Sequence, residues 1–382
     1  MKILHVVPSF HPATVYGGPV QAVYGLTRAL ARAGCDVRVL TTNTNGRHRL
    51  DVATDRDIRL EDGVSVRYCP RQARASVSLP LLGRLAAEVR AADVVHLAAT
   101  YSFPTIPTLL ACRRLGRPLV WSPRGGVLRW QRSRRAALKR VWEAACGAVA
   151  PSRLILHATS SEEADACARR FKTIRCVVIP NGVDVPADVL HVASNGTLRL
   201  LYVGRLDPIK GVENLLSACR LLREAPALAV RLTVAGDGDR TYVERLATLR
   251  DGLGLSDVSF IGAVDAAAKR RAFEAADLLV LPSHSESFGI VAAEALAHGV
   301  PVIAGYGTPW SGLEANGCGL WTDNSPEALA AAIRRAQSMP LREMGQRGRE
   351  WMREDFGWDG IAQHMLAVYR DLDGGRRLRS AS

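Results

Sequence analysis

The chain has 382 residues, a length typical of two domains, and its 48% hydrophobic and 23% charged residues are ordinary for a globular protein. The formal net charge of +13 suits phosphate-bearing partners or reflects arginines that solvate the surface, and without an RNA- or DNA-binding motif it does not support a nucleic-acid-binding function. No stretch approaches the ~18 uncharged apolar residues of a membrane span, and eight scattered cysteines without a C-x-x-C pair indicate reduced thiols in a cytoplasmic protein.

Strand-length apolar runs alternate with helix-period segments along the chain, which indicates parallel sheets wrapped by helices. In the first half we expect strands at residues 2–7, 36–42, 64–69, 93–98, 118–122, 153–159 and 176–180. Helices are expected between them at residues 19–33, 80–91, 104–115, 133–146 and 161–169. The first half therefore predicts an open α/β domain.

The same alternation restarts after residues 181–197, a segment rich in Asn, Gly, Pro and Asp that we interpret as an inter-domain linker. Strands are then expected at residues 198–204, 230–236, 258–262, 278–283 and 300–304. Helices are expected at residues 212–225, 241–251, 266–276, 288–298, 326–336, 341–354 and 358–371. The predicted domains are residues 1–185 and 186–357, with ligands bound beyond the carboxyl ends of the strands.

A glycine pair, Gly17 and Gly18, closes the loop after the first strand and directly precedes a helix. Such glycines let backbone N–H groups approach an anion at the positive helix end, although a flexible turn explains the pair equally well. The dinucleotide fingerprint G-x-G-x-x-G occurs nowhere in the chain, which disfavours a nicotinamide or flavin enzyme.

Two cations flank the turn "RLDPIKG" that follows the strand at residues 198–204. Together, Arg205 and Lys210 beside a helix start predict a diphosphate site, whereas either residue alone is better interpreted as a solvated loop charge.

Two carboxylates, Glu286 and Glu294, lie in the Ala-rich stretch "SHSESFGIVAAEALAHG". If the whole stretch were helical, eight residues would separate them by roughly 12 Å. Catalytic pairs of sugar hydrolases lie roughly 5–9.5 Å apart, so these two are poor hydrolytic partners. They are better interpreted as hydroxyl acceptors for one extended, polyhydroxylated ligand, or else as a capping and a surface glutamate.

In chain order, "PSFHPATVYGGPV", "PNGVD", "GRLDPIKG", "AGDGD", "SHSESFGIVAAEALAHGVPVIA" and "TPWSGLEANGCG" resemble motifs of the retaining nucleotide-sugar glycosyltransferases of family 4. The resemblance spans nearly the whole chain. It implies an α/β GT-B fold, with two Rossmann-like domains facing across a cleft and a C-terminal helix at residues 358–372 that packs back onto the first domain. It also implies transfer of a sugar from a nucleoside-diphosphate sugar to a glycan or polyprenyl-linked acceptor of a surface polysaccharide or glycoconjugate.

The resemblance also implies a role for each matching residue. Arg205 and Lys210 would neutralise the leaving diphosphate, Glu286 would bind the transferred sugar, and Glu294 would hold the ribose hydroxyls. The loop from Gly262 to Val264 would face the nucleobase. The donor site implied in this way comprises Gly17, Gly18, Arg205, Lys210, Gly262, Val264, Glu286, Phe288, Gly289, Ile290 and Glu294.

No cofactor or divalent metal is expected, because preorganised cations and a helix dipole can stabilise the charge that develops on a diphosphate. Asp237 and Asp239 of "AGDGD" lie between a strand and a helix, which fits a tight turn better than a metal site.

Two further positions concern the reacting groups. Many relatives carry His-x-His where this chain has His96 and Ala98, so His96 is either a catalytic residue of the cleft or a core histidine. Arg124 in "WSPRGGV" follows a strand and could meet an acceptor or donor phosphate.

Residues 128–146 combine basic side chains with Trp130 and Trp142. This composition fits either peripheral binding to the inner, anionic face of a membrane or a core helix with a solvated basic face. Two other functions stay open: a sugar-nucleotide epimerase of the same fold, and a non-catalytic nucleotide-sugar-binding partner.

Overall fold

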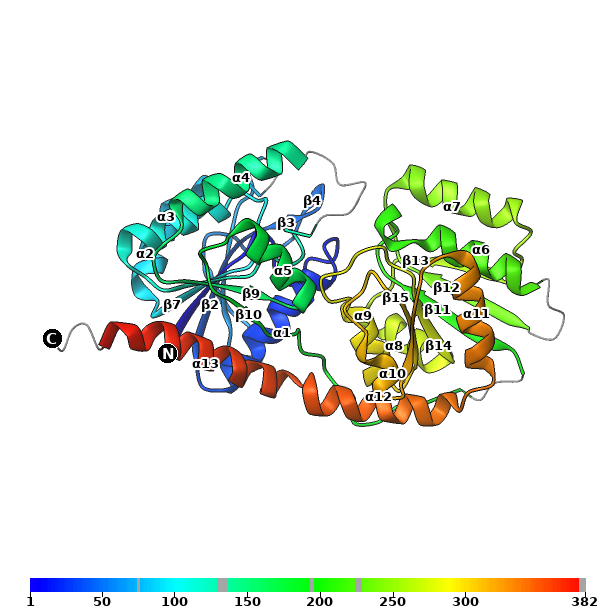
Figure 1. The fold of residues 1–382 in the computed structure, drawn as a ribbon. Coiled ribbons are helices and arrows are strands. Elements are labelled where there is room, and N and C mark those ends of the chain that lie inside the picture. Colours follow the sequence, from blue (N-terminus) through cyan, green and yellow to red (C-terminus); the bar gives the residue numbers. More distant parts are fainter. Residues whose placement is uncertain (74–75, 129–135, 193–195, 224–228, 378–382) are drawn as a thin grey trace. The chain divides into compact units, whose positions relative to one another are not determined.

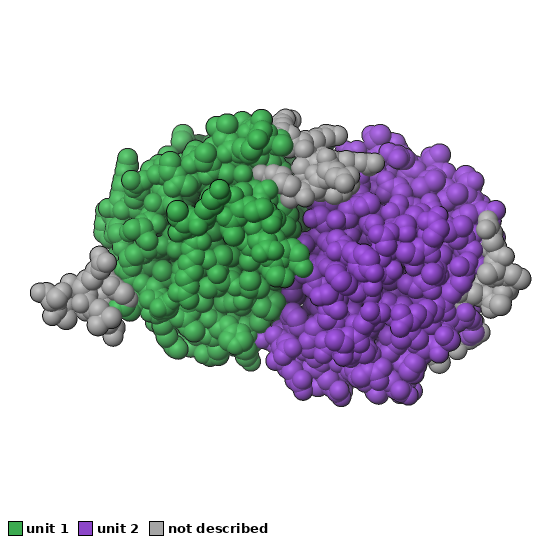
Figure 2. Space-filling model, viewed as in Figure 1, with its two compact units in different colours: residues 1–182, 358–382 green, residues 183–357 purple. Residues whose placement is uncertain are grey.

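A computed structural model describes residues 1–73, 76–128, 136–192, 196–223 and 229–377. The chain divides into two compact units, coloured separately in Figure 2. Unit 1 comprises Met1–Gly182 together with the segment from Trp358 onward, and unit 2 comprises Val183–Gly357. The chain therefore passes from unit 1 to unit 2 between residues 182 and 183, three residues before the domain boundary expected from the sequence. Most of the segment at residues 181–197, interpreted as a linker, belongs to unit 2.

Unit 1 is a sheet covered by helices on both faces (Figure 1). The strands run in the order β10-β9-β8-β7-β1-β2-β6-β5, all parallel except for the β5–β6 pair. They are β1 Lys2–Val6, β2 Asp36–Thr42, β5 Asp57–Arg59, β6 Ser65–Cys69, β7 Val94–Leu97, β8 Leu119–Trp121, β9 Leu154–Ala158 and β10 Cys176–Val178. A separate hairpin pairs β3 Thr44–Asn45 with β4 His48–Arg49.

The helices of unit 1 are α1 Gly18–Arg32, α2 Leu79–Ala91, α3 Thr105–Leu115, α4 Ala136–Val149, α5 Ser161–Arg170 and α13 Trp358–Arg377. The apolar residues of α1 and α13 pack on one face of the sheet, and those of α2 to α5 pack on the other. The C-terminal helix is anchored by Trp358, whose ring lies so close to Gly25 and Gly182 that any Cβ there would collide with it.

Unit 2 repeats the plan with an all-parallel sheet in the order β13-β12-β11-β14-β15-β16. Its strands are β11 Leu198–Val203, β12 Val230–Ala235, β13 Val258–Gly262, β14 Leu278–Leu281, β15 Val302–Gly305 and β16 Gly319–Thr322. The helices are α6 Val212–Arg223, α7 Arg240–Gly252, α8 Ala266–Ala275, α9 Ile290–Ala297, α10 Gly312–Ala315, α11 Pro326–Gln337 and α12 Leu341–Asp355, with a 3-10 turn at Pro208–Lys210. Chain order reverses between β11 and β14, and ligands of open parallel sheets bind beyond the carboxyl ends of strands at such a point.

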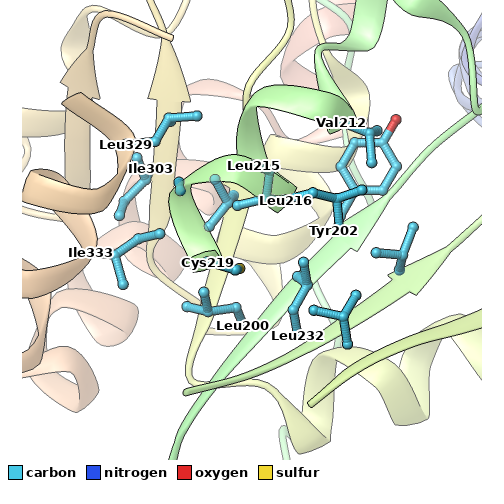
Figure 3. Close-up of a cluster of buried hydrophobic side chains, with 14 of the residues drawn as sticks. Leu200, Tyr202, Val212, Leu215, Leu216, Cys219, Leu232, Ile303, Leu329 and Ile333 are labelled. Atoms are coloured by element: carbon cyan, nitrogen blue, oxygen red, sulfur yellow. The ribbon is translucent and has the colours of Figure 1, made fainter. Parts of the chain in front are cut away.

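The core of unit 2 shows why this sequence forms these layers. On α6, Leu215, Leu216, Cys219 and Leu222 recur at helical spacing and form one buried face. They pack against strand residues such as Leu200 and α11 residues such as Ile333, as Figure 3 shows for the labelled members. The layers hold the loops at the carboxyl ends of the strands in place.

Within the described residues no helix is long and apolar enough to cross a membrane.

Candidate functional site

The site in unit 2 is built from two loops that follow neighbouring strands, β11 and β14. The His284 N–H donates to the Ile209 carbonyl oxygen at 2.8 Å and ties the loops together. Gly211 lies at φ 66°, and a Cβ there would lie 2.2 Å from the Pro282 carbonyl oxygen. Only glycine allows the two backbones to approach this closely.

Lys210 and Glu286 form an ion pair between these two loops. The Lys210 ammonium lies 2.6 Å from Oε1 of Glu286, and the Ser283 hydroxyl donates to the same oxygen at 3.0 Å. The side chains of Lys210 and Glu286 are only 18% and 13% exposed. The pair is thus largely shielded from water. Glu286 is held through Oε1, and none of the described residues donates to its Oε2, which can therefore accept from a hydroxyl.

Arg205 follows β11 and is exposed. Its loop is clamped to the loop after β12, because Leu206 N–H donates to the Asp237 carbonyl oxygen at 2.8 Å and a Cβ at Gly236 would lie 1.8 Å from the Gly204 carbonyl oxygen. No ion pair of the Arg205 guanidinium is found among the residues that the structure describes. Arg205 therefore supplies a positive charge that no carboxylate of the site cancels.

The two aspartates of "AGDGD" bond to backbone N–H groups of their own turn. Asp239 caps α7 by accepting from Thr241 N–H at 3.2 Å, and Asp237 accepts from Gly238 N–H at 2.7 Å. The motif forms the loop between β12 and α7, where the sequence analysis placed it.

The stretch between Glu286 and α9 differs from the sequence expectation. Gly289 adopts a left-handed conformation at φ 74°, and the helix begins only at Ile290, not at residue 288. The Phe288 carbonyl oxygen accepts from the Trp310 indole N–H at 2.6 Å, which holds this turn against the core. Glu286 therefore lies in a loop, and the helical spacing of roughly 12 Å does not describe its separation from Glu294.

Glu294 lies inside α9 and is paired with Lys269 of α8. The distance from the ammonium to Oε1 is 2.5 Å, and the side chains are 19% and 17% exposed. Each carboxylate of the site thus has its own lysine.

Gly262 and Val264 also lie at this edge of the sheet. The Gly262 carbonyl oxygen accepts from Gly236 N–H at 2.7 Å, and Val264 packs partly against the core. The structure thus places the residues expected for the nucleobase beside the loop that clamps Arg205.

In unit 1 the glycine pair begins α1. Gly17 is the N-terminal cap at φ 57°, with open space where a Cβ would stand, and Gly18 is the first helical residue. The preceding loop is fixed by Asn45, whose side-chain oxygen accepts from Thr14 N–H at 3.2 Å and Val15 N–H at 3.1 Å.

His96 is a core residue. It is 0% exposed, its Nδ1 lies 2.5 Å from the Tyr369 hydroxyl of α13, and its Nε2 lies 2.7 Å from the Ser122 hydroxyl. Burial lowers the pKa of His96 well below its usual value, and the nearby His5 and His157 lower it further. His96 thus lies in the buried core of unit 1, and a part for it in the reaction stays a prediction.

Arg124 lies at the carboxyl end of β8 with φ 53° and donates to the Asn181 side chain. The buried carboxylate of Glu163 holds this loop, since it accepts from Gly125 N–H and from both the N–H and the hydroxyl of Thr159 at 2.8 Å. Burial lowers the pKa of the Arg124 guanidinium, an effect opposed by the charge of Glu163.

The basic segment proposed for a membrane surface is described only in part, because Arg129, Trp130, Arg132, Arg134 and Arg135 lie outside the described residues. In α4, the Trp142 indole N–H donates to the Thr100 carbonyl oxygen at 2.7 Å. Leu138 and Val141 of the same helix are 62% and 67% exposed. The face of α4 buried in unit 1 contains Glu143 and Cys146.

Comparison with known proteins supports one family over most of the chain. Residues 16–186 match the family described as Glycosyltransferase Family 4, and residues 191–351 match the family described as Glycosyl transferases group 1. A D-inositol 3-phosphate glycosyltransferase of Kineococcus radiotolerans is 32% identical, with 96% of this chain and 93% of that protein covered. The chain belongs to glycosyltransferase family 4.

This family 4 glycosyltransferase is also similar to solved structures. Sucrose-phosphate synthase from Thermosynechococcus elongatus has a TM-score of 0.75 and 23% identity, with 100% of both chains covered. Anabaena HepE in complex with UDP has a TM-score of 0.74 and 19% identity, with 97% of this chain and 100% of that chain covered. These likenesses show the fold, and the predicted GT-B architecture of two Rossmann-like domains is confirmed.

Sequence reasoning missed Lys269 and Ser283 of this glycosyltransferase. Lys269 stands in the basic run "KRR" of an exposed helix, and its partner lies 25 residues away. Ser283 could have been found, since only Pro282 separates it from the buried run of β14, and polar residues beyond the carboxyl end of a parallel strand meet ligands.

Proposed function

We propose that this glycosyltransferase transfers a sugar from a nucleoside-diphosphate sugar to a glycan or lipid-linked acceptor, with retention of configuration and without a metal ion. One observation carries the proposal: Arg205 and the Lys210–Glu286 pair lie on loops that meet at the point where the chain order of the unit 2 sheet reverses. That position of an open parallel sheet binds phosphate-bearing ligands.

The reaction breaks the bond between the anomeric carbon and the diphosphate oxygen, and the electron pair leaves with the diphosphate. The same carbon forms a bond to a hydroxyl oxygen of the acceptor, and the proton of that hydroxyl is taken up by the leaving diphosphate. Negative charge grows on the leaving group while the sugar gains oxocarbenium character. Arg205 and Lys210 would stabilise the leaving group, and Lys210 is already oriented by Glu286 at 2.6 Å. Cations held in place before the reaction need no reorganisation when charge develops.

The remaining oxygen of Glu286 would accept a hydrogen bond from a hydroxyl of the transferred sugar, and Glu294 would accept one from the ribose. Anabaena HepE is described in complex with UDP and with UDP-glucose, which makes UDP-sugars the first donors to test. The relatives named D-inositol 3-phosphate glycosyltransferase make inositol phosphate the first soluble acceptor to test beside lipid-linked glycans.

An epimerase of the same fold would use the diphosphate site but would need an acid–base group at the sugar. His96, the histidine considered for that role, is fully buried with both ring nitrogens hydrogen-bonded. This favours transfer over epimerisation, and detection of a glycosylated acceptor would also exclude a non-catalytic binding protein.

The deciding experiment is calorimetric titration with UDP, GDP, ADP and their common sugars, with and without magnesium. We expect one nucleotide to bind equally well under both conditions and Arg205→Ala to lose about tenfold or more in affinity. Arg334→Ala is the matched control, because Arg334 lies at the far end of α11 and contacts the Leu221 carbonyl oxygen. Absence of binding, or equal affinity of both variants, would refute the donor site.

We also propose that the outer face of α4 binds an anionic membrane surface. Leu138 and Val141 lie one turn apart and are 62% and 67% exposed, and the exposed Arg140 stands between them. Exposed aliphatic side chains beside cations are the combination that amphipathic helices use at lipid headgroups.

Vesicle flotation tests this surface. Leu138→Ser with Val141→Ser should abolish flotation with vesicles that contain phosphatidylglycerol, and neutral phosphatidylcholine vesicles should bind less of the wild-type protein. Leu190→Ser is the control, because Leu190 is 68% exposed and belongs to unit 2. Flotation that survives the double substitution would contradict the proposal.

A further inference from the structure

Lys269 and Glu294 form a contact between α8 and α9, and a second contact one turn further along joins α8 to His298, the C-cap residue of α9. The first contact joins the Lys269 ammonium to Oε1 of Glu294 at 2.5 Å. The second places the rings of Phe273 and His298 4.9 Å apart. Lys269 and Phe273 are four residues apart on α8, and Glu294 and His298 are four residues apart at the end of α9, so the two contacts lie side by side and hold the two helices against each other.

The Glu294 carboxylate is held firmly by these contacts. Phe273 is fully buried, and His298 is anchored to α9 because its Nδ1 lies 2.8 Å from the Glu294 carbonyl oxygen. The ion pair itself is only 19% and 17% exposed. By contrast, Arg270 on the next position of α8 pairs with Glu274 of its own helix and is 53% exposed. Lys269 is therefore the member of this basic run that reaches another element of unit 2.

The geometry leaves Glu294 with one oxygen for a ligand. Oε1 accepts from Lys269, and no donor to Oε2 is found among the described residues. A hydroxyl could donate to Oε2, and an ammonium carries three N–H donors, of which Glu294 takes one. The pair therefore presents an acceptor next to a donor, which matches the two neighbouring hydroxyls of a ribose.

We propose that Lys269 is a positioning and specificity residue that makes the enzyme discriminate ribonucleotides from deoxyribonucleotides. This proposal rests on the proposed function, in which Glu294 binds the ribose. Lys269 orients the free oxygen of Glu294 towards one hydroxyl and donates to the oxygen of its neighbour. A ligand that lacks either hydroxyl leaves a charged, half-buried group without its partner, which is the situation that rejects analogues most strongly.

The test measures the affinity of UDP, 2′-deoxy-UDP and 3′-deoxy-UDP by calorimetry, or of the same set on whichever base binds in the nucleotide panel. The wild-type protein should prefer the ribonucleotide by about tenfold or more. In Lys269→Met the affinity for the ribonucleotide should fall by about tenfold. The ratio of the affinities for the ribonucleotide and the deoxyribonucleotides should then approach one. Arg270→Met, which removes the neighbouring ion pair, should leave both quantities unchanged.

The possible outcomes separate this proposal from the function on which it rests. If Glu294→Gln abolishes the preference but Lys269→Met retains it, Lys269 has no part in specificity although the donor site stands. If Lys269→Met weakens ribo- and deoxyribonucleotides equally, its role is only structural and the proposal is wrong. If the wild-type protein binds none of the nucleotides, the proposed function itself fails. A melting temperature for each variant establishes that it is folded.

Discussion

Acidification should destabilise unit 1 through histidines buried in its core. His5 is stacked on His96 with ring centroids 4.8 Å apart, and neither of its ring nitrogens has a hydrogen-bond partner among the described residues. Burial, reinforced by the charge of Arg124, lowers the pKa of His5 to about 3. His5 thus stays neutral in the folded protein, whereas the unfolded chain protonates it below its ordinary pKa of about 6.5.

The sign and size of the effect follow from this difference. Between pH 6.5 and pH 3 the unfolded chain binds more protons than the folded protein, so the free energy of unfolding falls as the pH falls. At pH 5, His5 alone should lower it by about 2 kcal/mol relative to pH 7.5. Because pH 5 lies well above the folded pKa, this figure depends on the unfolded value and hardly on how far burial lowers the folded one.

His5→Leu isolates this contribution, since leucine has a similar volume and no titrating group. Urea unfolding of both proteins at pH 7.5 and pH 5.0 gives four free energies of unfolding. Contributions of the other titrating groups cancel when the change with pH in the variant is subtracted from the change in the wild-type protein. We expect the loss of stability on acidification to be about 2 kcal/mol smaller in the variant. Equal losses in the two proteins would show that His5 is accessible to protons in the folded state and would refute the reasoning.

Three further substitutions test contacts described above. Gly236→Ala places a Cβ 1.8 Å from the Gly204 carbonyl oxygen, so it should lower both the melting temperature and nucleotide affinity, and an unchanged affinity would show that this loop does not hold the donor site. Trp358→Ala should cost about 3–5 kcal/mol in urea unfolding, because its ring is buried among residues of unit 1. Lys210→Met should lower turnover, measured at saturating donor, by about tenfold or more. The reason is that the substitution removes the cation paired with Glu286 and one of the two cations expected to stabilise the leaving diphosphate. Normal turnover would show that Lys210 takes no part in the mechanism.

Most of the fold could be predicted from the sequence, because buried strands leave continuous apolar runs. The run "LLVL" of β14 is buried on both faces and stands out in any window. The hairpin β3–β4 and the short β5 were missed because strands of two or three residues carry no measurable alternation. The start of α9 was placed two residues early because the apolar letters continue through Gly289, whose left-handed backbone delays the helix.

The sequence singled out the residues of the candidate site, but it did not show which of them pair with each other. Glu286 and Glu294 were predicted as site residues because acids are unusual in an Ala-rich segment that follows a buried strand. Their lysines lie 76 and 25 residues away, and such contacts leave no periodic trace in the chain. The burial of His96 was equally hidden from the sequence, because its hydrogen-bond partner Tyr369 lies 273 residues further along the chain, in α13.

The two lysine–glutamate pairs resolve a difficulty in the proposed function. A diphosphate that enters a site with two carboxylates would be repelled if those charges were uncompensated. Lys210 lies 2.6 Å from Glu286 and Lys269 lies 2.5 Å from Glu294, so each carboxylate is balanced before a ligand arrives. Under the proposed function, Arg205, which has no carboxylate partner among the described residues, would then provide the net attraction. Each glutamate is held by its lysine through Oε1, so both could accept a hydrogen bond from a ligand hydroxyl through Oε2 while keeping their counterions. Binding of the sugar and ribose hydroxyls would then not compete with binding of the diphosphate.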